Sequence, residues 1–441
     1  MLAKVFFFLK KNITYLIILY VLVQIVYIIF LPVKFQSDSL YNYKLAEQCV
    51  KMSSFYPFHQ QMYEDYIIAP LYINLLVVVL RIFNSTVTIG VLNIALNLLQ
   101  LFFLYRIVKI ILNEDVAKIT TILYIFYLNT LGLVLLNYTE LFFGVLVLAS
   151  IFFYLRKKKF DQFFAGFFAA ASIGVRPLGW ALIAAYIFFY LYDIFKRSKI
   201  KIHLLPIVAG FSIFILLYGM INLLYFGEFV YTSTNGSVNI LIGANDDATG
   251  AFNGKVFEKG NIGYINNAEK LTYLEKDKIY KDAAINWIEH HPIKWVSLIP
   301  VKVVYIFLWD DISISALANL QNWDFFQITK HLIKNKNFSG MMPGLNPVEK
   351  ILYLLFQAFN YLYYILLIVL FLGGLILLKK EGRLPDNIRL ILIFCIIGIA
   401  ITMLVFGMPR FKYPYIIVAL PLAAVKINSI FDNYLTNPRK V

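Results

Sequence analysis

The sequence predicts an all-α polytopic membrane protein, and its composition is the first of three observations that predict it. Of its 441 residues, 61% are hydrophobic, 17% are aromatic and only 15% are charged, and the mean hydropathy is +0.73. Soluble globular proteins contain about 45–50% apolar and about 25% charged residues. The composition therefore excludes a soluble enzyme, a disordered chain and a disulfide scaffold.

Long apolar runs are the second observation, because a spanning helix needs about 20 mostly apolar residues. The candidate spans are 12–32, 67–83, 86–112, 116–135, 138–155, 160–175, 178–195, 203–226, 351–378, 388–407 and 412–428. A further run, 296–309, is too short for a clear span. The pattern predicts one transmembrane domain over residues 1–441, with about ten to twelve membrane-spanning helices.

The distribution of positive charge is the third observation. The net charge is +15, from 40 Lys and Arg against 25 Asp and Glu. The basic residues cluster between apolar runs, at Lys10-Lys11, Arg156 to Lys159, Lys196 to Lys201, Lys379 to Arg383 and Arg439-Lys440. This pattern is typical of cytoplasmic loops, which are enriched in Lys and Arg. The charge therefore indicates topology and no nucleic-acid partner.

The path of the chain predicts where non-membrane structure lies. The first apolar stretch is too long for the core of a cleavable signal peptide and predicts a signal-anchor helix with Lys10 and Lys11 inside. The polar stretches 33–66 and 227–350 are then extracytoplasmic, the second covering a site. Seven apolar segments lie between residues 67 and 226, where an even number is needed. One segment within 116–175 must be re-entrant or broken, and 296–309 is expected to dip in and return.

The polar stretches also predict short elements. A surface helix is expected over 40–52, with Ser37 or Asp38 as the N-cap. Residues 235–263 contain six glycines and five asparagines, a composition typical of a loop. An amphipathic helix is expected over 268–291.

Common enzyme motifs do not explain the function. The segment 243–250 lacks the Gly-Lys-Ser/Thr ending of a P-loop, and no HExxH, CxxC or GxSxG motif occurs. Cys49 and Cys395 lie far apart and have no zinc-ligand spacing. His290 and His291 are neighbours, so on a helix their side chains point about 100° apart.

Asp38 is the leading candidate for chemistry. It follows the first predicted span by six residues, at the membrane surface, with Tyr41 and Tyr43 close in sequence. A carboxylate there could act as a general base toward an acceptor hydroxyl or hold a divalent ion. The structural alternative is the N-cap named above.

Charges next to membrane spans are the other candidates. Glu140 begins an apolar segment, Arg176 precedes a proline between two segments, and Arg410 and Lys412 lie between the last two predicted spans. Charges at membrane depth are costly and need a partner or a polar cavity. Cations on the inferred outer face favour an anion such as phosphate, with headgroup snorkelling as the alternative.

Short motifs, taken in the order in which they occur along the chain, resemble those of GT-C glycosyltransferases. Within that group, the resemblance is to the family-39-like members, which are related to protein O-mannosyltransferases and lipid A aminoarabinose transferases. Asp38-Ser39-Leu40-Tyr41-Asn42-Tyr43-Lys44-Leu45-Ala46 resembles the D-x-x-x-Y-x-x-x-A entry motif in its Asp and Ala. The other matching segments are Ala69 to Tyr72, Thr139 to Phe142, Ala165 to Pro177, Phe226 to Asn245 and Pro409 to Pro414.

The resemblance implies roles for the candidate residues. Asp38 would be the catalytic base and a ligand for a divalent cation, Mg or Mn, and Glu140 a second acidic residue of the cavity. The substrate-binding set would be Arg410 on the lipid phosphate, with Lys412, Arg176, Tyr41, Tyr43, Glu64, Asp65 and Asn235. One departure is Ile67-Ile68, which stands where aminoarabinose transferases carry an acidic residue and a lysine.

The same resemblance implies the reaction and its location. A polyprenyl-phosphate-linked sugar would be the donor and a lipid, glycan or protein hydroxyl the acceptor, at the extracytoplasmic face of a bacterial inner membrane. The alternatives are a transporter or flippase of lipid-linked solutes, and a polysaccharide polymerase or ligase. A transporter would predict inverted repeats, and none is visible in the sequence.

Overall fold

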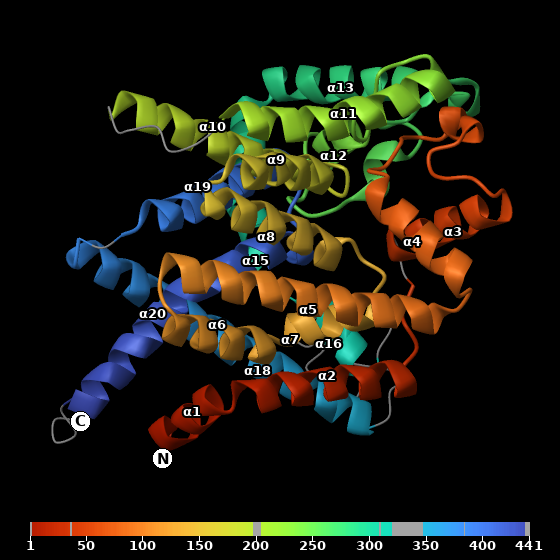
Figure 1. The fold of residues 1–441 in the computed structure, drawn as a ribbon. Coiled ribbons are helices and arrows are strands. Elements are labelled where there is room, and N and C mark those ends of the chain that lie inside the picture. Colours follow the sequence, from red (N-terminus) through yellow and green to blue (C-terminus); the bar gives the residue numbers. More distant parts are fainter. Residues whose placement is uncertain are drawn as a thin grey trace.

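A computed structural model describes residues 2–35, 38–196, 204–307, 310–319, 347–382 and 384–436, and helices dominate these residues (Figure 1). The longer helices are α1 (Leu2–Lys11), α2 (Ile13–Phe30), α3 (Asp38–Lys51), α4 (Leu71–Ile82), α5 (Thr86–Ile111), α6 (Glu114–Phe126), α8 (Glu140–Arg156), α9 (Lys159–Ile173), α10 (Trp180–Phe195), α11 (Leu204–Phe226), α13 (Tyr273–His290), α18 (Pro347–Lys380), α19 (Asp386–Leu404) and α20 (Tyr413–Thr436). The predicted all-α polytopic class is confirmed.

Seven stretches of the described chain are long and apolar enough to cross a membrane: α2, α5, α11, Pro292–Leu317, α18, α19 and Pro409–Asp432. The bent pair α6 and Leu128–Leu135 raises the number to eight when counted as one span. This is fewer than the ten to twelve expected, because α4, α8, α9 and α10 are only 12 to 17 residues long. Pro70 and Pro177 delay the start of two of them.

The broken segment predicted within 116–175 is present. Helix α6 and the short stretch α7 (Leu128–Gly132) with η2 (Leu133–Leu135) meet at a bend of 59°. A polar stripe on α5 compensates for the break: Asn93, Asn97 and Gln100 are fully buried at helical spacing. Their amides donate hydrogen bonds of 2.6–3.1 Å to the main-chain oxygens of Thr130, Val134, Leu136 and Leu141. Irregular backbone at membrane depth needs such partners.

Helices α9 and α11 are packed closely through two glycines. A Cβ atom at Gly166 would lie 1.9 Å from the Ile207 carbonyl oxygen, and one at Gly210 would lie 2.0 Å from that of Phe163. Small residues allow such close helix approach in membranes, where packing drives association. A side chain at either position would therefore force the two helices apart.

The extramembrane elements differ from expectation in two places. The predicted loop 235–263 contains α12 (Gly236–Ile242), because Val238, Leu241 and Ile242 are buried with Tyr280 and Trp287 of α13 in a separate apolar cluster. The predicted helix 268–291 begins later. Its main helix, α13, starts at Tyr273 after a capping box formed by Thr272 and Glu275.

The surface helix expected over 40–52 is α3, which begins at Asp38. Ser37, the other N-cap candidate, lies outside the described residues, as does 320–346 of the predicted outer stretch 227–350.

The basic clusters and the polar elements lie at opposite ends of the bundle. In Figure 1, α1, the far end of α10 and the turn between α18 and α19 lie at the left, whereas α3 and α4 lie at the right. Lys10 pairs with Asp115 at 2.8 Å, which places the N-terminal basic pair beside the turn before α6. The described clusters Lys10-Lys11 and Lys379-Lys380 therefore share one end, and Asp38 lies at the other.

Candidate active site

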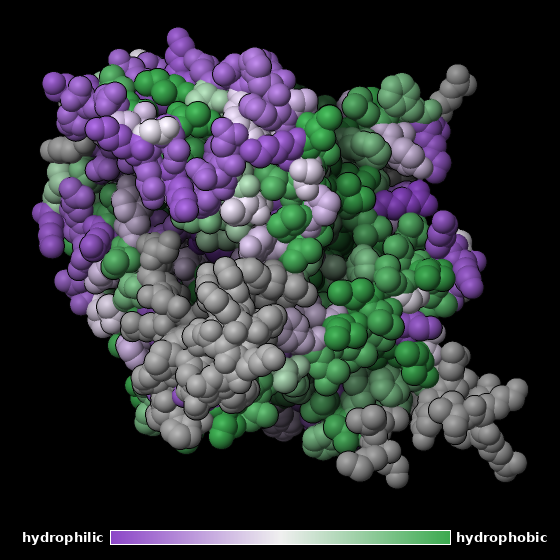
Figure 2. Space-filling model, turned by 180° about the vertical axis from the view of Figure 1, so that it is seen from behind, coloured by the Kyte–Doolittle hydropathy of each residue, from purple (hydrophilic) through white to green (hydrophobic). Residues whose placement is uncertain are grey.

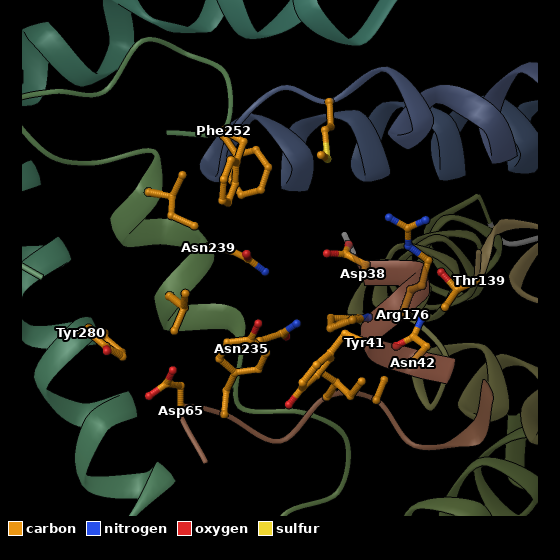
Figure 3. A pocket seen from close by; sticks show the side chains of 18 of the residues that line it. Asp38, Tyr41, Asn42, Asp65, Thr139, Arg176, Asn235, Asn239, Phe252 and Tyr280 are labelled. Carbon is orange, nitrogen blue, oxygen red and sulfur yellow. The ribbon is translucent and has the colours of Figure 1, made fainter. Parts of the chain in front are cut away.

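A cavity of about 670 Å³ opens between α3, α12, α13 and the segment before α20 (Figure 3). Asp38 reaches it from the first turn of α3. Arg410 reaches it from η7 (Pro409–Lys412), a single 3-10 turn that enters α20. Two residues that are 372 positions apart in the sequence thus meet in one wall and form an ion pair.

Glu140 and Arg176 extend this pair to four side chains of alternating charge. The Arg410 Nε atom lies 3.8 Å from Glu140 Oε1, and Arg176 Nη1 donates to the same oxygen at 2.5 Å. Asp38 is 56% exposed, the two arginines 15% and 14%, and Glu140 0%. The order from cavity to core is therefore Asp38, the guanidinium groups and Glu140.

Aromatic faces hold the two guanidinium groups in place. The Arg410 guanidinium carbon lies 4.8 Å from the centre of the Tyr138 ring, and that of Arg176 lies 5.3 Å from the Phe411 ring. Cation–π contacts of this kind are worth about 0.5–2 kcal/mol. The anion that Arg410 was expected to need is supplied here by Asp38 and Glu140, and the snorkelling alternative does not describe this largely buried side chain.

Glu140 lies behind the cavity wall. It is the first residue of α8 and is fully buried, while its neighbours Tyr138 and Thr139 line the cavity. Its Oε1 atom serves both arginines, and its Oε2 atom is buried with no hydrogen bond among the described residues. The position is that of a residue that holds the arginines, one layer away from a substrate.

Lys412 points away from the cavity. Its Nζ atom lies 3.0 Å from Asp310 Oδ1, and the two side chains are 0% and 1% exposed. Asn129 and Asn360 donate to the same carboxylate at 2.7 and 3.2 Å. Asp310 was not predicted, because it stood at the edge of a polar stretch assigned to the outside.

The remaining predicted site residues divide into two groups. Tyr41, Asp65 and Asn235 line the cavity, and Figure 3 shows them together with Asp38. Tyr43 instead packs on Phe35, with 4.5 Å between the ring centres. Glu64 is exposed and does not line the cavity. Asp65 also forms an ion pair with Lys276, with 3.2 Å between Asp65 Oδ1 and Lys276 Nζ.

Other lining residues were missed by sequence reasoning, among them Asn42, Tyr66, Asn239 and Tyr280. Burial, reinforced by Asp38, raises the pKa of Tyr66, and burial with Asp65 nearby raises the pKa of Tyr280 to about 12. Both phenols are therefore neutral near pH 7. The spacing of Asn42 four residues after Asp38 was the available signal, since i and i+4 share a helix face.

The donor set around Asp38 does not fit the predicted divalent cation. Its carboxylate faces Arg410, and the described residues bring together no group of three or more His, Cys, Asp or Glu side chains. Mg²⁺ and Ca²⁺ bind through several oxygen ligands. Positive charge at this point is supplied instead by the guanidinium groups of Arg410 and Arg176.

Comparison with family models and with curated proteins gives no match. Solved structures do match. One match is AglB oligosaccharyltransferase from Archaeoglobus fulgidus, in complex with an inhibitory peptide and a dolichol-phosphate. It is 13% identical in sequence, the alignment covers 98% of this chain and 52% of the AglB chain, and the TM-score is 0.49. A second structure of the Archaeoglobus fulgidus oligosaccharyltransferase, with Zn and sulfate, is 12% identical, with 96% and 50% covered and a TM-score of 0.47.

A third match is ArnT from Cupriavidus metallidurans in the apo state. It is 11% identical in sequence, the alignment covers 94% of this chain and 77% of the ArnT chain, and the TM-score is 0.38. This chain spans about half the length of the archaeal structures. Because all three TM-scores are below 0.5, these matches assign no substrate and no residue role to this chain.

Proposed function

We propose that this chain transfers a sugar from a polyprenyl-phosphate-linked donor to an acceptor hydroxyl, with Asp38 as the general base. One observation carries the proposal: a half-exposed carboxylate and two guanidinium groups share the wall of one cavity in a membrane-spanning bundle. A base and an anion site are the two parts that this displacement needs.

The chemistry divides between these groups. Asp38 accepts the proton of the acceptor hydroxyl as its oxygen bonds to the anomeric carbon. The bond from that carbon to the phosphate oxygen breaks, and the lipid phosphate leaves with the electron pair. Arg410 and Arg176 stabilise the departing phosphate, because a guanidinium offers two parallel donors to such oxygens. Single displacement inverts the anomeric configuration, which linkage analysis of the product tests.

The resting ion pair gives these events an order. Arg410 is bound to Asp38 in the structure, so a donor phosphate that binds Arg410 competes with this carboxylate. Displaced from its cation, Asp38 becomes a better hydrogen-bond acceptor for the incoming hydroxyl. Glu140 keeps Arg176 and Arg410 in the wall throughout. Binding of the donor therefore prepares the base.

The proposed location is the extracytoplasmic side of a bacterial inner membrane. Asp38 and the described basic clusters lie at opposite ends of the bundle, and cytoplasmic loops are the ones enriched in Lys and Arg. Lipid-linked donors would then reach Arg410 from the outer leaflet.

Lipid analysis of a deletion strain tests the function. Loss of the gene should cause a polyprenyl-phosphate-linked sugar to accumulate, as measured by mass spectrometry, and the wild-type gene should restore the normal level. A folded Asp38→Asn protein should fail to restore it, whereas Asp247→Asn, an exposed loop residue outside the cavity lining, should succeed. Restoration by Asp38→Asn would refute the base assignment, and no accumulating lipid-linked sugar would refute the donor class.

A further inference from the structure

The cavity has a second end that the proposed chemistry does not use. Figure 3 shows Asn235 and Asn239 between Asp38 on one side and Asp65 with Tyr280 on the other. Asn235 and Asn239 are four residues apart at α12, so they share one face of it. Tyr66 and Phe257 also line the cavity, and both lie near Tyr280.

The phenol of Tyr280 at this end has no protein partner. Tyr280 is only 6% exposed, lines the cavity, and makes no side-chain hydrogen bond among the described residues. The Tyr280 oxygen is not among the fully enclosed atoms without a partner, so its partner is supplied from the cavity, by water or by a ligand. A ligand hydroxyl that replaces this water would make the same hydrogen bond.

The second end carries little net charge. Asp65 is the acidic residue of its lining, and Lys276 neutralises it at 3.2 Å while also donating to the Tyr63 carbonyl oxygen at 2.9 Å. The remaining polar groups are neutral amides and phenols. This excludes strong selection for a cationic or anionic acceptor and favours one that is neutral and rich in hydroxyl groups.

The residue types fit a carbohydrate. An asparagine amide both donates and accepts, as does a phenol, and sugar hydroxyls need both. Tyrosine and phenylalanine rings present apolar faces to the C–H faces of a pyranose ring. Phe257 and Tyr280 stand edge to face with ring centres 5.7 Å apart, which gives this end a rigid apolar corner.

We propose that the end formed by Asn235, Asn239, Tyr66 and Tyr280 is the acceptor subsite, and that the acceptor is a neutral saccharide. This inference rests on the proposed function, in which Asp38 lies beside the acceptor hydroxyl. The sugar would lie on α12 with its reacting hydroxyl toward Asp38. A protein acceptor is the alternative outcome of the test below.

Binding of simple glycosides tests the subsite without requiring turnover. The full chain is placed in lipid nanodiscs, because maltoside detergents would themselves present sugar. Methyl α-D-mannopyranoside and methyl β-D-glucopyranoside are the probes, and N-acetyl-threonine amide is the peptide comparison. Saturation-transfer NMR should show binding of at least one glycoside and none of the threonine probe.

Two variants locate the binding. Tyr280→Phe removes one oxygen and should weaken glycoside binding about fivefold, and Asn239→Ala about tenfold, the effects of losing one and two neutral hydrogen bonds. Tyr225→Phe and Asn286→Ala, exposed residues outside the lining, are the matched controls and should bind as the wild type does.

The outcomes separate this inference from the function it rests on. Absent glycoside binding, binding unchanged in both variants, or binding of the threonine probe would overturn the saccharide subsite, whatever the deletion strain accumulates. Glycoside binding that both variants weaken would support it even if Asp38→Asn restored the lipid level, in which case only the base assignment fails.

Discussion

Arg410 and Lys412 stand two residues apart on the same 3-10 turn, yet they enter opposite environments. Arg410 faces the cavity and pairs with Asp38, which is 56% exposed. Lys412 faces the bundle core, and its pair with Asp310 is almost fully enclosed. One short turn therefore carries one cation toward substrate and one toward the core.

The two pairs also differ in how completely their hydrogen bonds are made. Asp310 receives Asn129 and Asn360 in addition to Lys412, so each oxygen of its carboxylate is engaged. In the cavity, Arg410 Nε and Glu140 Oε2 are buried without a hydrogen bond among the described atoms. Asn360 Oδ1 beside Asp310 also lacks a hydrogen bond among the described atoms, but Asn360 is buried and lies outside the cavity lining. The enclosed pair therefore serves structure, whereas unused hydrogen-bonding capacity beside a cavity is available to a ligand.

Breaking the sealed pair should have the largest effect. Lys412→Met leaves a buried carboxylate without its cation, which costs about 3–5 kcal/mol. We expect little folded protein, measured as the monodisperse fraction and the thermal unfolding midpoint in nanodiscs. The double variant Lys412→Met with Asp310→Leu removes both charges and should recover much of the loss. If Lys412→Met unfolded at the wild-type midpoint, the structural assignment of this pair would be wrong.

Breaking the cavity pair from the acidic side should change activity and leave folding nearly intact. Asp38→Asn removes the proposed base and should lower the transfer rate about 10²- to 10⁴-fold. Because Asp38 is half exposed, its loss should shift the unfolding midpoint little. The assay uses the donor lipid identified in the deletion strain, with Asp247→Asn as the control. If Asp38→Asn lost as much folded protein as Lys412→Met does, both ion pairs would be structural and the contrast between them would fail.

Weakening the cavity pair from the basic side should have a smaller effect. Arg410→Lys keeps the charge and removes the two-pronged geometry, so we expect the KM for the donor lipid to rise about tenfold. The rate at saturating donor should fall less than in Asp38→Asn. Arg81→Lys is the matched control, since Arg81 donates to the Ser54 carbonyl oxygen away from the cavity. An unchanged donor KM in Arg410→Lys would remove the phosphate role.

Sequence reasoning succeeded where the cue was local. Apolar runs predicted the helical membrane class, and the odd number of segments predicted the break between α6 and α7. Asp38 was selected because it follows the first span at the membrane surface, and Arg410 and Arg176 because charges beside spans need partners. The structure brings all three to one cavity. Their catalytic roles remain proposals.

The rest depended on contacts between distant segments. Nothing near Lys412 indicates Asp310, which lies 102 positions away. It becomes the partner of Lys412 only in the folded chain, where η7 packs on α15 (Ile299–Phe307). Helix α12 was hidden by its glycine and asparagine content, since it forms by burying three apolar side chains against α13. The role of the α5 amides likewise appears only once the break that they bridge is known.

The smallest expected effect lies outside both pairs and provides the baseline. Thr272 caps α13 in a capping box with Glu275, and Thr272→Ala should cost about 1 kcal/mol of stability. Because the cap lies eight residues before Tyr280, we expect sugar transfer by the folded protein to stay within about twofold of wild type, while the unfolding midpoint falls slightly. Thr249→Ala, a loop threonine without a helix cap, controls for the lost hydroxyl. If this mild destabilisation lowered transfer as far as Asp38→Asn, activity would be reporting on stability, and the contrast between the open and sealed pairs would lose its functional meaning.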